Sequence, residues 1–258
     1  MQHVVVATDL TPASETAVER AATASRAMGA GLRLVHMLPE LMPPLVGPAR
    51  VRKAEAALHY RAQSLHYRLG ARVTSNVVKG DTSRGIVRES ENLGAVLTVF
   101  GRRTDGGESL RLIGTTLERS LRLIRNAALI VRDRSPVRAS YRKALLAPDG
   151  GVDEQSLMPY MHHLAPDAAV HRIDRLSPGG GRKARQKVAD QVRAMRRALD
   201  ADLLVIGMPR DETLNPFRFR RLLTSLVRAP ECDTLIVPQE CDVVPVGVVE
   251  PGQVRIAS

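Results

Sequence analysis

Short apolar segments alternate with longer amphipathic ones along this chain, and this alternation constrains its fold more than any other feature. The first apolar segment, HVVVAT at 3–8, is rich in Val, as expected of a strand buried on both faces of a parallel sheet. Thr11 and Pro12 then supply an N-cap residue and a proline for the first turn of a helix. The order of strand and helix recurs to residue 131, which predicts a parallel sheet with right-handed crossovers.

Residues 1–135 are predicted to form one complete domain. Its strands are expected at 3–8, 32–38, 71–78, 95–100 and 127–131. Its helices are expected at about 12–28, 50–69, 81–94 and 114–125. A proline-rich loop at 39–48 precedes the second helix, and a glycine-rich loop that begins at 101 precedes the fourth. The last helix is therefore expected to begin at Gly114.

The pattern begins again after a linker at 134–140, so the chain contains an internal repeat of one domain length. Strands are expected at 143–148, 169–173, 203–206 and 234–237, with helices up to 164, at 182–199 and at 220–228. This second domain, 141–239, lacks one helix and one strand, and 240–258 forms a tail. The sequence thus predicts two tandem, doubly wound α/β domains with parallel sheets, the second of them shortened.

The composition narrows the classes of partner. A formal net charge of +11 attracts nucleotides, nucleic acids, acidic lipids or acidic proteins, unless arginine simply serves as the solvating charge. Aromatic residues make up 3% of the chain, which disfavours stacking on single-stranded nucleic acid. No run reaches the roughly 20 apolar residues of a membrane span, and no secretory signal is evident, so we expect no membrane partner. The two cysteines lack C-x-x-C spacing, and a cytoplasmic location with reduced thiols is expected.

Ligands of open α/β sheets bind beyond the carboxyl ends of the strands, where the strand order reverses. In the first domain the loops at 9–11 and 101–115 are expected to meet there. The glycines of the second loop permit close backbone approach and positive φ, and the expected helix start at Gly114 would offer amide groups to a phosphate. Arg102, Arg103 and Arg111 add positive charge. On spacing alone, a flexible loop before a glycine helix start is favoured over a phosphate site.

Four segments carry a resemblance to a known family: VVVATDLTPASETAVERA, LRLVHMLP, VKGDTSRGIVRESENLGAVLTVFG and LIGTTLERSLRLIRNAALIV. With the loop between the last two, they resemble the universal stress protein family, in its tandem form, over 1–239. Nucleotide-binding members carry Gly, two residues, Gly, nine residues, then Gly-Ser or Gly-Thr. Gly101, Gly114 and Thr115 match this motif, whereas Thr104 stands in place of the second glycine.

The resemblance implies the fold shared with adenine nucleotide α-hydrolases and a ligand such as ATP, ADP or AMP, with or without Mg²⁺. The positions that it implies for the nucleotide are Asp9, the backbone of Met37, Gly101, Arg103, Thr104, Gly114, Thr115 and Thr116. The Cβ of Thr104 disfavours positive φ and so weakens the expected phosphate contacts. No residue resembles a dedicated activator of water, so hydrolysis is expected to be slow at most. We expect no protein metal site.

The second domain departs further from the motif. Gly207 matches its first glycine, but Arg210 replaces the second and Thr224-Ser225 stands where Gly-Ser is expected. This domain is therefore expected to have lost the nucleotide cradle. The arginine-rich segment 218–228 fits an anion site, a solvated helix face or a dimer rim.

Three functions stay open on the sequence. A stress-response or regulatory protein that binds an adenine nucleotide comes first. A dimerising adaptor that docks protein partners without a nucleotide is the alternative. A nucleic-acid binder, suggested by charge alone, is third because no recognised motif accompanies the charge. The two domains are expected to form a pseudo-dimer within one chain, or the chain a homodimer. Isolated histidines such as His36 are expected to pack in the core or lie on the surface.

Overall fold

The structure is a computed structural model, and it describes residues 1–102, 109–147, 154–173, 182–208, 232–239, 241 and 243–246, with side chains at all of these except 109–115 and 182–186. The chain divides into two compact units, Met1–Arg138 and Ala139–Ser258. Each unit is built on a parallel sheet, as the sequence predicts.

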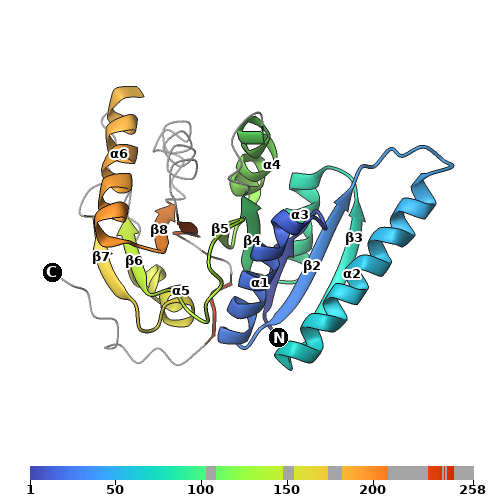
Figure 1. Cartoon of the computed structure of the whole chain (residues 1–258), viewed down its shortest axis with the longest axis horizontal. Coiled ribbons are helices and arrows are strands. Elements are labelled where there is room, and N and C mark those ends of the chain that lie inside the picture. The colour runs from blue at the N-terminus through green and yellow to red at the C-terminus, as the bar shows by residue number, and fades with distance from the viewer. Residues whose placement is uncertain are drawn as a thin grey trace. The chain divides into compact units, whose positions relative to one another are not determined.

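In the described part of the first unit, five strands alternate with four helices (Figure 1). The elements in chain order are β1 (His3–Ala7), α1 (Pro12–Ala27), β2 (Gly31–Leu38), α2 (Gly47–Leu69), β3 (Val73–Lys79), α3 (Thr82–Asn92), β4 (Ala95–Arg102), α4 (Ser109–Leu123) and β5 (Ala127–Arg132). The strands pair in parallel in the order β3-β2-β1-β4-β5. This order and alternation confirm the predicted α/β fold.

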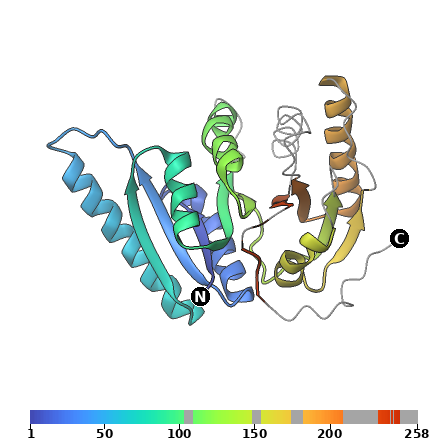
Figure 2. The same ribbon diagram turned by 180° about the vertical axis from the view of Figure 1, so that it is seen from behind.

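Helices cover both faces of this sheet. The chain runs from β1 outward to β3, returns to β4 and continues to β5, so right-handed crossovers send α1 and α2 to one face and α3 and α4 to the other. Figure 1 shows the face that carries α1, and Figure 2 shows α3 from the opposite side. Because both faces are covered, Val4, Val5 and Val6 of β1 are fully buried.

Two helices begin earlier than the sequence indicates. Helix α2 begins at Gly47, because Pro48 occupies its first turn, where a proline needs no amide partner, and does not end the preceding loop. Helix α4 begins at Ser109 and not at Gly114. Leu and Arg at 110–112 are strong helix formers, and a single glycine inside a helix destabilises it by only about 1 kcal/mol. The expected helix start at Gly114 was therefore wrong.

The second unit repeats this plan with four described strands. Its elements are β6 (Lys143–Ala147), the 3₁₀ turn η1 (Glu154–Ser156), α5 (Met158–Leu164), β7 (Ala169–Arg172), α6 (Arg182–Leu199), β8 (Leu203–Met208) and β9 (Asp233–Pro238). They pair in parallel in the order β9-β8-β6-β7. The expected helix at 220–228, Arg210 and Thr224-Ser225 lie outside the described residues.

A buried group of three polar side chains links α3, β4 and the start of β5. Ser90 Oγ lies 2.8 Å from Thr98 Oγ1 and donates to Asn126 Oδ1 at 3.1 Å. Asn126 Nδ2 in turn donates to Thr98 Oγ1 at 3.1 Å. Ser90 and Thr98 are 1% and 0% exposed, so their hydroxyls depend on these partners and not on water.

We expect Asn126→Ala to lower the free energy of unfolding by about 1–3 kcal/mol, because it removes the shared partner of two buried hydroxyls. Urea denaturation of the full chain measures this change. The control Asn92→Ala removes the same amide from an exposed position of α3 and should change stability by less than about 0.5 kcal/mol. Equal effects of the two substitutions would contradict a stabilising role for the buried group.

Candidate functional site

A cavity of about 430 Å³ lies at the carboxyl ends of β1, β2 and β4. Strand β1 pairs with β2 on one side and β4 on the other, so the strand order reverses at this point. The cavity brings together four of the residues that the sequence analysis singled out: Asp9, Met37, Gly101 and Thr116. They come from the ends of three strands and from α4, which Ser83 of α3 holds through a 3.1 Å hydrogen bond to the Thr116 carbonyl.

Asp9 sits in a turn held by hydrogen bonds among its own residues. Its Oδ1 accepts the Thr11 N–H at 2.9 Å and the Thr11 hydroxyl at 2.6 Å. Leu10 adopts a left-handed conformation, with φ +62°, and donates its N–H to Thr8 Oγ1 at 3.1 Å. A leucine is strained in this conformation, and such strain persists where surrounding hydrogen bonds fix the backbone, often at ligand sites.

Thr11 occupies the N-cap position of α1, but its hydroxyl does not cap the helix. The predicted capping bond is absent, and the hydroxyl instead donates to Asp9 Oδ1. Burial raises the pKa of Asp9, but hydrogen bonds from Thr11, from Ser14 and from its own backbone together outweigh burial, so the pKa lies below its ordinary value. Asp9 therefore enters the cavity as a carboxylate, and neither Thr11 bond uses its Oδ2.

His36 also lines the cavity, although the sequence analysis expected a packing or surface role for it. Its Nδ1 lies 2.9 Å from the Thr8 carbonyl, which can only accept, so Nδ1 must be the donor. In the neutral ring this leaves Nε2 as an acceptor. Its place near the carboxyl end of β2, next to Met37, was the signal that could have identified it.

Gly85 of α3 is a second site residue that the sequence analysis missed. A Cβ on Gly85 would overlap the Sδ and Cε atoms of Met37, so only glycine lets the Met37 side chain lie against the helix. Met37 in turn packs on the buried cluster that contains Val5 and Val35. The Met37 side chain thus forms part of the cavity wall, in addition to the backbone contact that the family resemblance implies.

Gly101 serves close packing and not an unusual backbone conformation. A Cβ at this position would lie 3.3 Å from the Cβ of Ala17 in α1, a tight contact. Its φ is not among the positive values, which corrects the expectation of positive φ at this glycine. Gly114 and Thr115 lie inside α4, where their side chains are not described, and Arg103, Thr104, Gly106 and Gly107 lie outside the described residues.

The described wall of the cavity is largely apolar. Val35, Ile86, Phe100 and Leu117 are among its apolar residues, while Asp9 is the charged residue in the described lining. Among the residues that the structure describes, no group of His, Cys, Asp and Glu could hold a metal ion. An apolar wall with one carboxylate suits a ligand that joins a flat apolar ring to a group with hydroxyl donors.

Comparison with known proteins identifies the class. The model of the universal stress protein family matches residues 1–132, just over half of the chain. The chain therefore belongs to the universal stress protein family. Comparison with curated proteins gives no match.

Solved structures share the fold over nearly the whole chain. A universal stress protein from Archaeoglobus fulgidus DSM 4304 is 16% identical, covers 92% of this chain and 96% of its own, and has a TM-score of 0.69. A putative universal stress protein from Pseudomonas aeruginosa UCBPP-PA14 is 18% identical, covers 92% and 93%, and has a TM-score of 0.64. A universal stress protein solved in complex with cAMP is 26% identical over 51% of this chain and 97% of its own, with a TM-score of 0.42.

Thr11→Val should raise the pKa of Asp9 towards its ordinary value of about 3.9, because the variant lacks the hydroxyl that donates to Oδ1. Since the parent carboxyl has a lowered pKa, it contributes stability above about pH 4 that is lost as pH falls through the folded value. The variant should lose part of this dependence. NMR titration of the Asp9 carboxyl carbon tests the shift, and an unchanged or lower pKa would contradict the hydrogen-bond account.

Proposed function

We propose that the first unit binds an adenine nucleotide, ATP, ADP or AMP, in the cavity at the ends of β1, β2 and β4. The protein would then act as a nucleotide-responsive regulator in the cytoplasm, with slow hydrolysis at most. One observation carries this proposal: four positions that the family resemblance implies for the nucleotide line a single cavity, although they are far apart in the sequence.

The described lining of the cavity fits a nucleoside. Its volume of about 430 Å³ lies within the roughly 300–1,000 Å³ typical of small-molecule sites. Phe100, Ile86 and Leu117 offer an apolar surface to the base. The Asp9 carboxylate, fixed through Oδ1 by Thr11, offers Oδ2 to the ribose hydroxyls.

The phosphates are expected near the start of α4. Because α4 begins at Ser109, its unpaired amide groups belong to its first four residues, and Gly114 and Thr115 lie deeper in the helix. The start of α4 is therefore the more favourable end for an anion. Arg103 in the preceding loop and the Thr116 side chain in the cavity wall are the further candidates for phosphate contacts.

The second unit is proposed as a structural partner without a nucleotide. The proposal rests on its departures from the family motif at Arg210 and Thr224-Ser225. Titration of the full chain should accordingly give one nucleotide per chain.

Asp9→Asn should weaken ATP binding at least about tenfold. The asparagine Oδ1 can keep both Thr11 hydrogen bonds, but an uncharged NH₂ group replaces the anionic oxygen offered to the ribose, which removes the charge-assisted hydrogen bonds from the ribose hydroxyls. Isothermal titration calorimetry with ATP measures the affinity. Asp167→Asn makes the same change at an exposed position of the second unit and should leave the affinity unchanged.

Measurements on the parent protein also distinguish nucleotide binding from the adaptor alternative. ATP at 100 times its Kd should add roughly 2.7 kcal/mol to the stability of a nucleotide-binding protein and raise its Tm. No heat of binding and no change in Tm with ATP, ADP or AMP would contradict the nucleotide proposal and favour an adaptor that docks protein partners.

Gly85→Ala should preserve or slightly raise stability while it weakens ATP binding. Alanine is favoured over glycine inside a helix by up to about 1 kcal/mol, and the end of a methionine side chain moves easily. The new methyl group displaces the Met37 side chain, which lines the cavity. Adding Met37→Ala should restore part of the affinity, measured by the same titration. Independent effects of the two substitutions would show that Gly85 does not shape the site through Met37.

A further inference from the structure

We propose that the first unit also carries a docking surface for an anionic phospholipid bilayer, on the turn at 39–46 and the outer face of α2. We call this the α2 surface. It comprises Leu41, Leu45, Val46, Arg50, Arg52, Lys53, Tyr60 and Tyr67. None of these residues lines the cavity described above.

The turn that precedes α2 places apolar side chains in water. Leu45 and Leu41 are 95% and 91% exposed, the highest values among the large apolar side chains in the described chain, and Val46 is 56% exposed. Single exposed leucines are common on protein surfaces, but three such side chains within six residues form a patch. Figure 1 shows this turn extending beyond the ends of β2 and β3.

Hydrogen bonds, packing and prolines hold the turn at 39–46 in this exposed conformation. The Pro43 carbonyl accepts the N–H groups of Val46 at 3.0 Å and Gly47 at 2.8 Å. Met42 packs inward on Gly47, where an added Cβ would lie 3.2 Å from the Met42 Cβ. Prolines at 39, 43 and 44 restrict the backbone further. Because the turn is already ordered, insertion of its leucines into a membrane requires little additional loss of conformational entropy.

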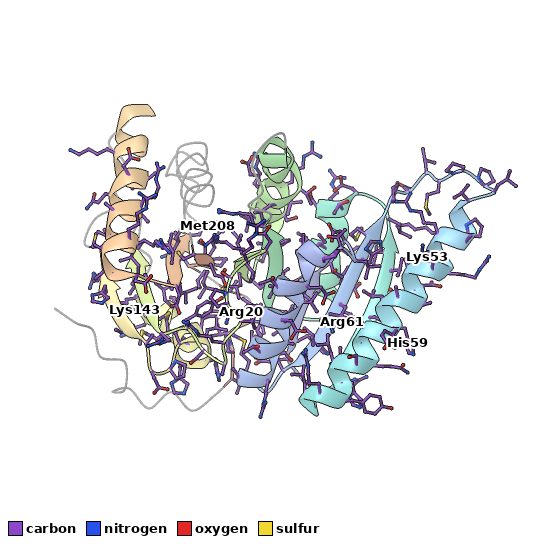
Figure 3. All side chains as sticks on the ribbon, in the orientation of Figure 1. Arg20, Lys53, His59, Arg61, Lys143 and Met208 are labelled. Atoms are coloured by element: carbon purple, nitrogen blue, oxygen red, sulfur yellow. The ribbon has the colours of Figure 1, made fainter. Side chains whose placement is uncertain are left out.

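Positive charge adjoins the apolar turn. Arg50, Arg52 and Lys53 are exposed in the first two turns of α2, and none has an ion pair among the described residues. The exposed carboxylates of this stretch are Glu40 in the turn and Glu55 in α2, so the three cations outnumber them. Glu19 of α1 instead pairs with Arg61 and Arg68, each at 2.6 Å. Figure 3 shows Lys53 near the turn and Arg61 towards α1. Each exposed cation near an anionic leaflet favours binding.

Two tyrosines continue the surface along α2. Lys53, Tyr60 and Tyr67 are spaced seven residues apart, close to two helical turns, so they follow one stripe of the helix. Tyr60 is 75% exposed and Tyr67 is 83% exposed. Tyrosine favours the boundary between headgroups and acyl chains, since its ring is apolar and its hydroxyl polar.

A lipid surface fits these residues better than other anionic partners. Nucleic acid would match the cations, but Leu41 and Leu45 would gain little from a phosphate backbone. An acidic peptide in the hollow between α2 and β3, which Arg52 and Glu55 line, would leave Leu41 and Leu45 uncovered. In the described part of the chain no helix could cross a bilayer, but surface binding needs none. The expectation of no membrane partner was based on spanning and signal segments, which this surface does not require.

Sedimentation of the full chain with vesicles tests this proposal at physiological ionic strength. We expect binding to vesicles that contain phosphatidylglycerol and not to vesicles of phosphatidylcholine alone. Leu41→Ser with Leu45→Ser should weaken binding at least about tenfold, because it removes the inserted apolar groups. Arg50→Gln with Lys53→Gln should weaken it by about thirtyfold.

The matched control is Arg84→Gln with Arg88→Gln, which removes the same charge from exposed positions of α3 on the other face of the sheet. It should retain the parent affinity within about twofold, and every variant should retain the parent Tm. Absence of binding to anionic vesicles would overturn the proposal. So would binding that is unaffected by the leucine substitutions, or equal losses in the control, because either result would indicate attraction by net charge alone.

Discussion

The pairing of β1 with both β2 and β4 determines where the other parts of the first unit can lie. The chain leaves β1 towards β2 through α1 and reaches β4 from β3 through α3, so these connections cover opposite faces. Their loops separate at the carboxyl end of β1, and the space between them is the cavity. The cavity is thus a consequence of strand order, whereas its chemistry depends on the residues that end each strand.

Those residues hold one another in place through short-range contacts. The Thr11 hydroxyl donates to Asp9, which favours the ionised carboxyl. The Thr8 hydroxyl accepts the N–H of the strained Leu10, and the Thr8 carbonyl accepts from His36. The glycine at 85 leaves room for Met37. The unit also has a different outer surface, because Arg61 and Arg68 of α2 pair with Glu19 of α1, whereas Arg50, Arg52 and Lys53 near its start are exposed to solvent. A ligand site and a docking surface can therefore coexist on one small domain.

The sequence predicted the fold well because burial on both faces leaves a direct signature, as in the Val-rich run of β1. It also predicted that Asp9 and Gly101 lie at one site, since both were expected at the carboxyl ends of strands that end at the same edge of the sheet, and both line the cavity. It did not predict the start of α4, because Gly114 fits a helix start and a helix interior equally well. The roles of Gly85 and of the Thr11 hydroxyl depend on partners that only the folded chain brings into contact.

Hydrogen exchange of the full chain, followed by mass spectrometry with and without ATP, tests most directly whether the cavity at the carboxyl end of β1 is a nucleotide site. ATP should slow exchange in the segments that line the cavity, at 8–14, 35–37, 82–86, 100–101 and 116–117, and leave the second unit unchanged. Unchanged exchange throughout, or protection confined to the second unit, would contradict the account.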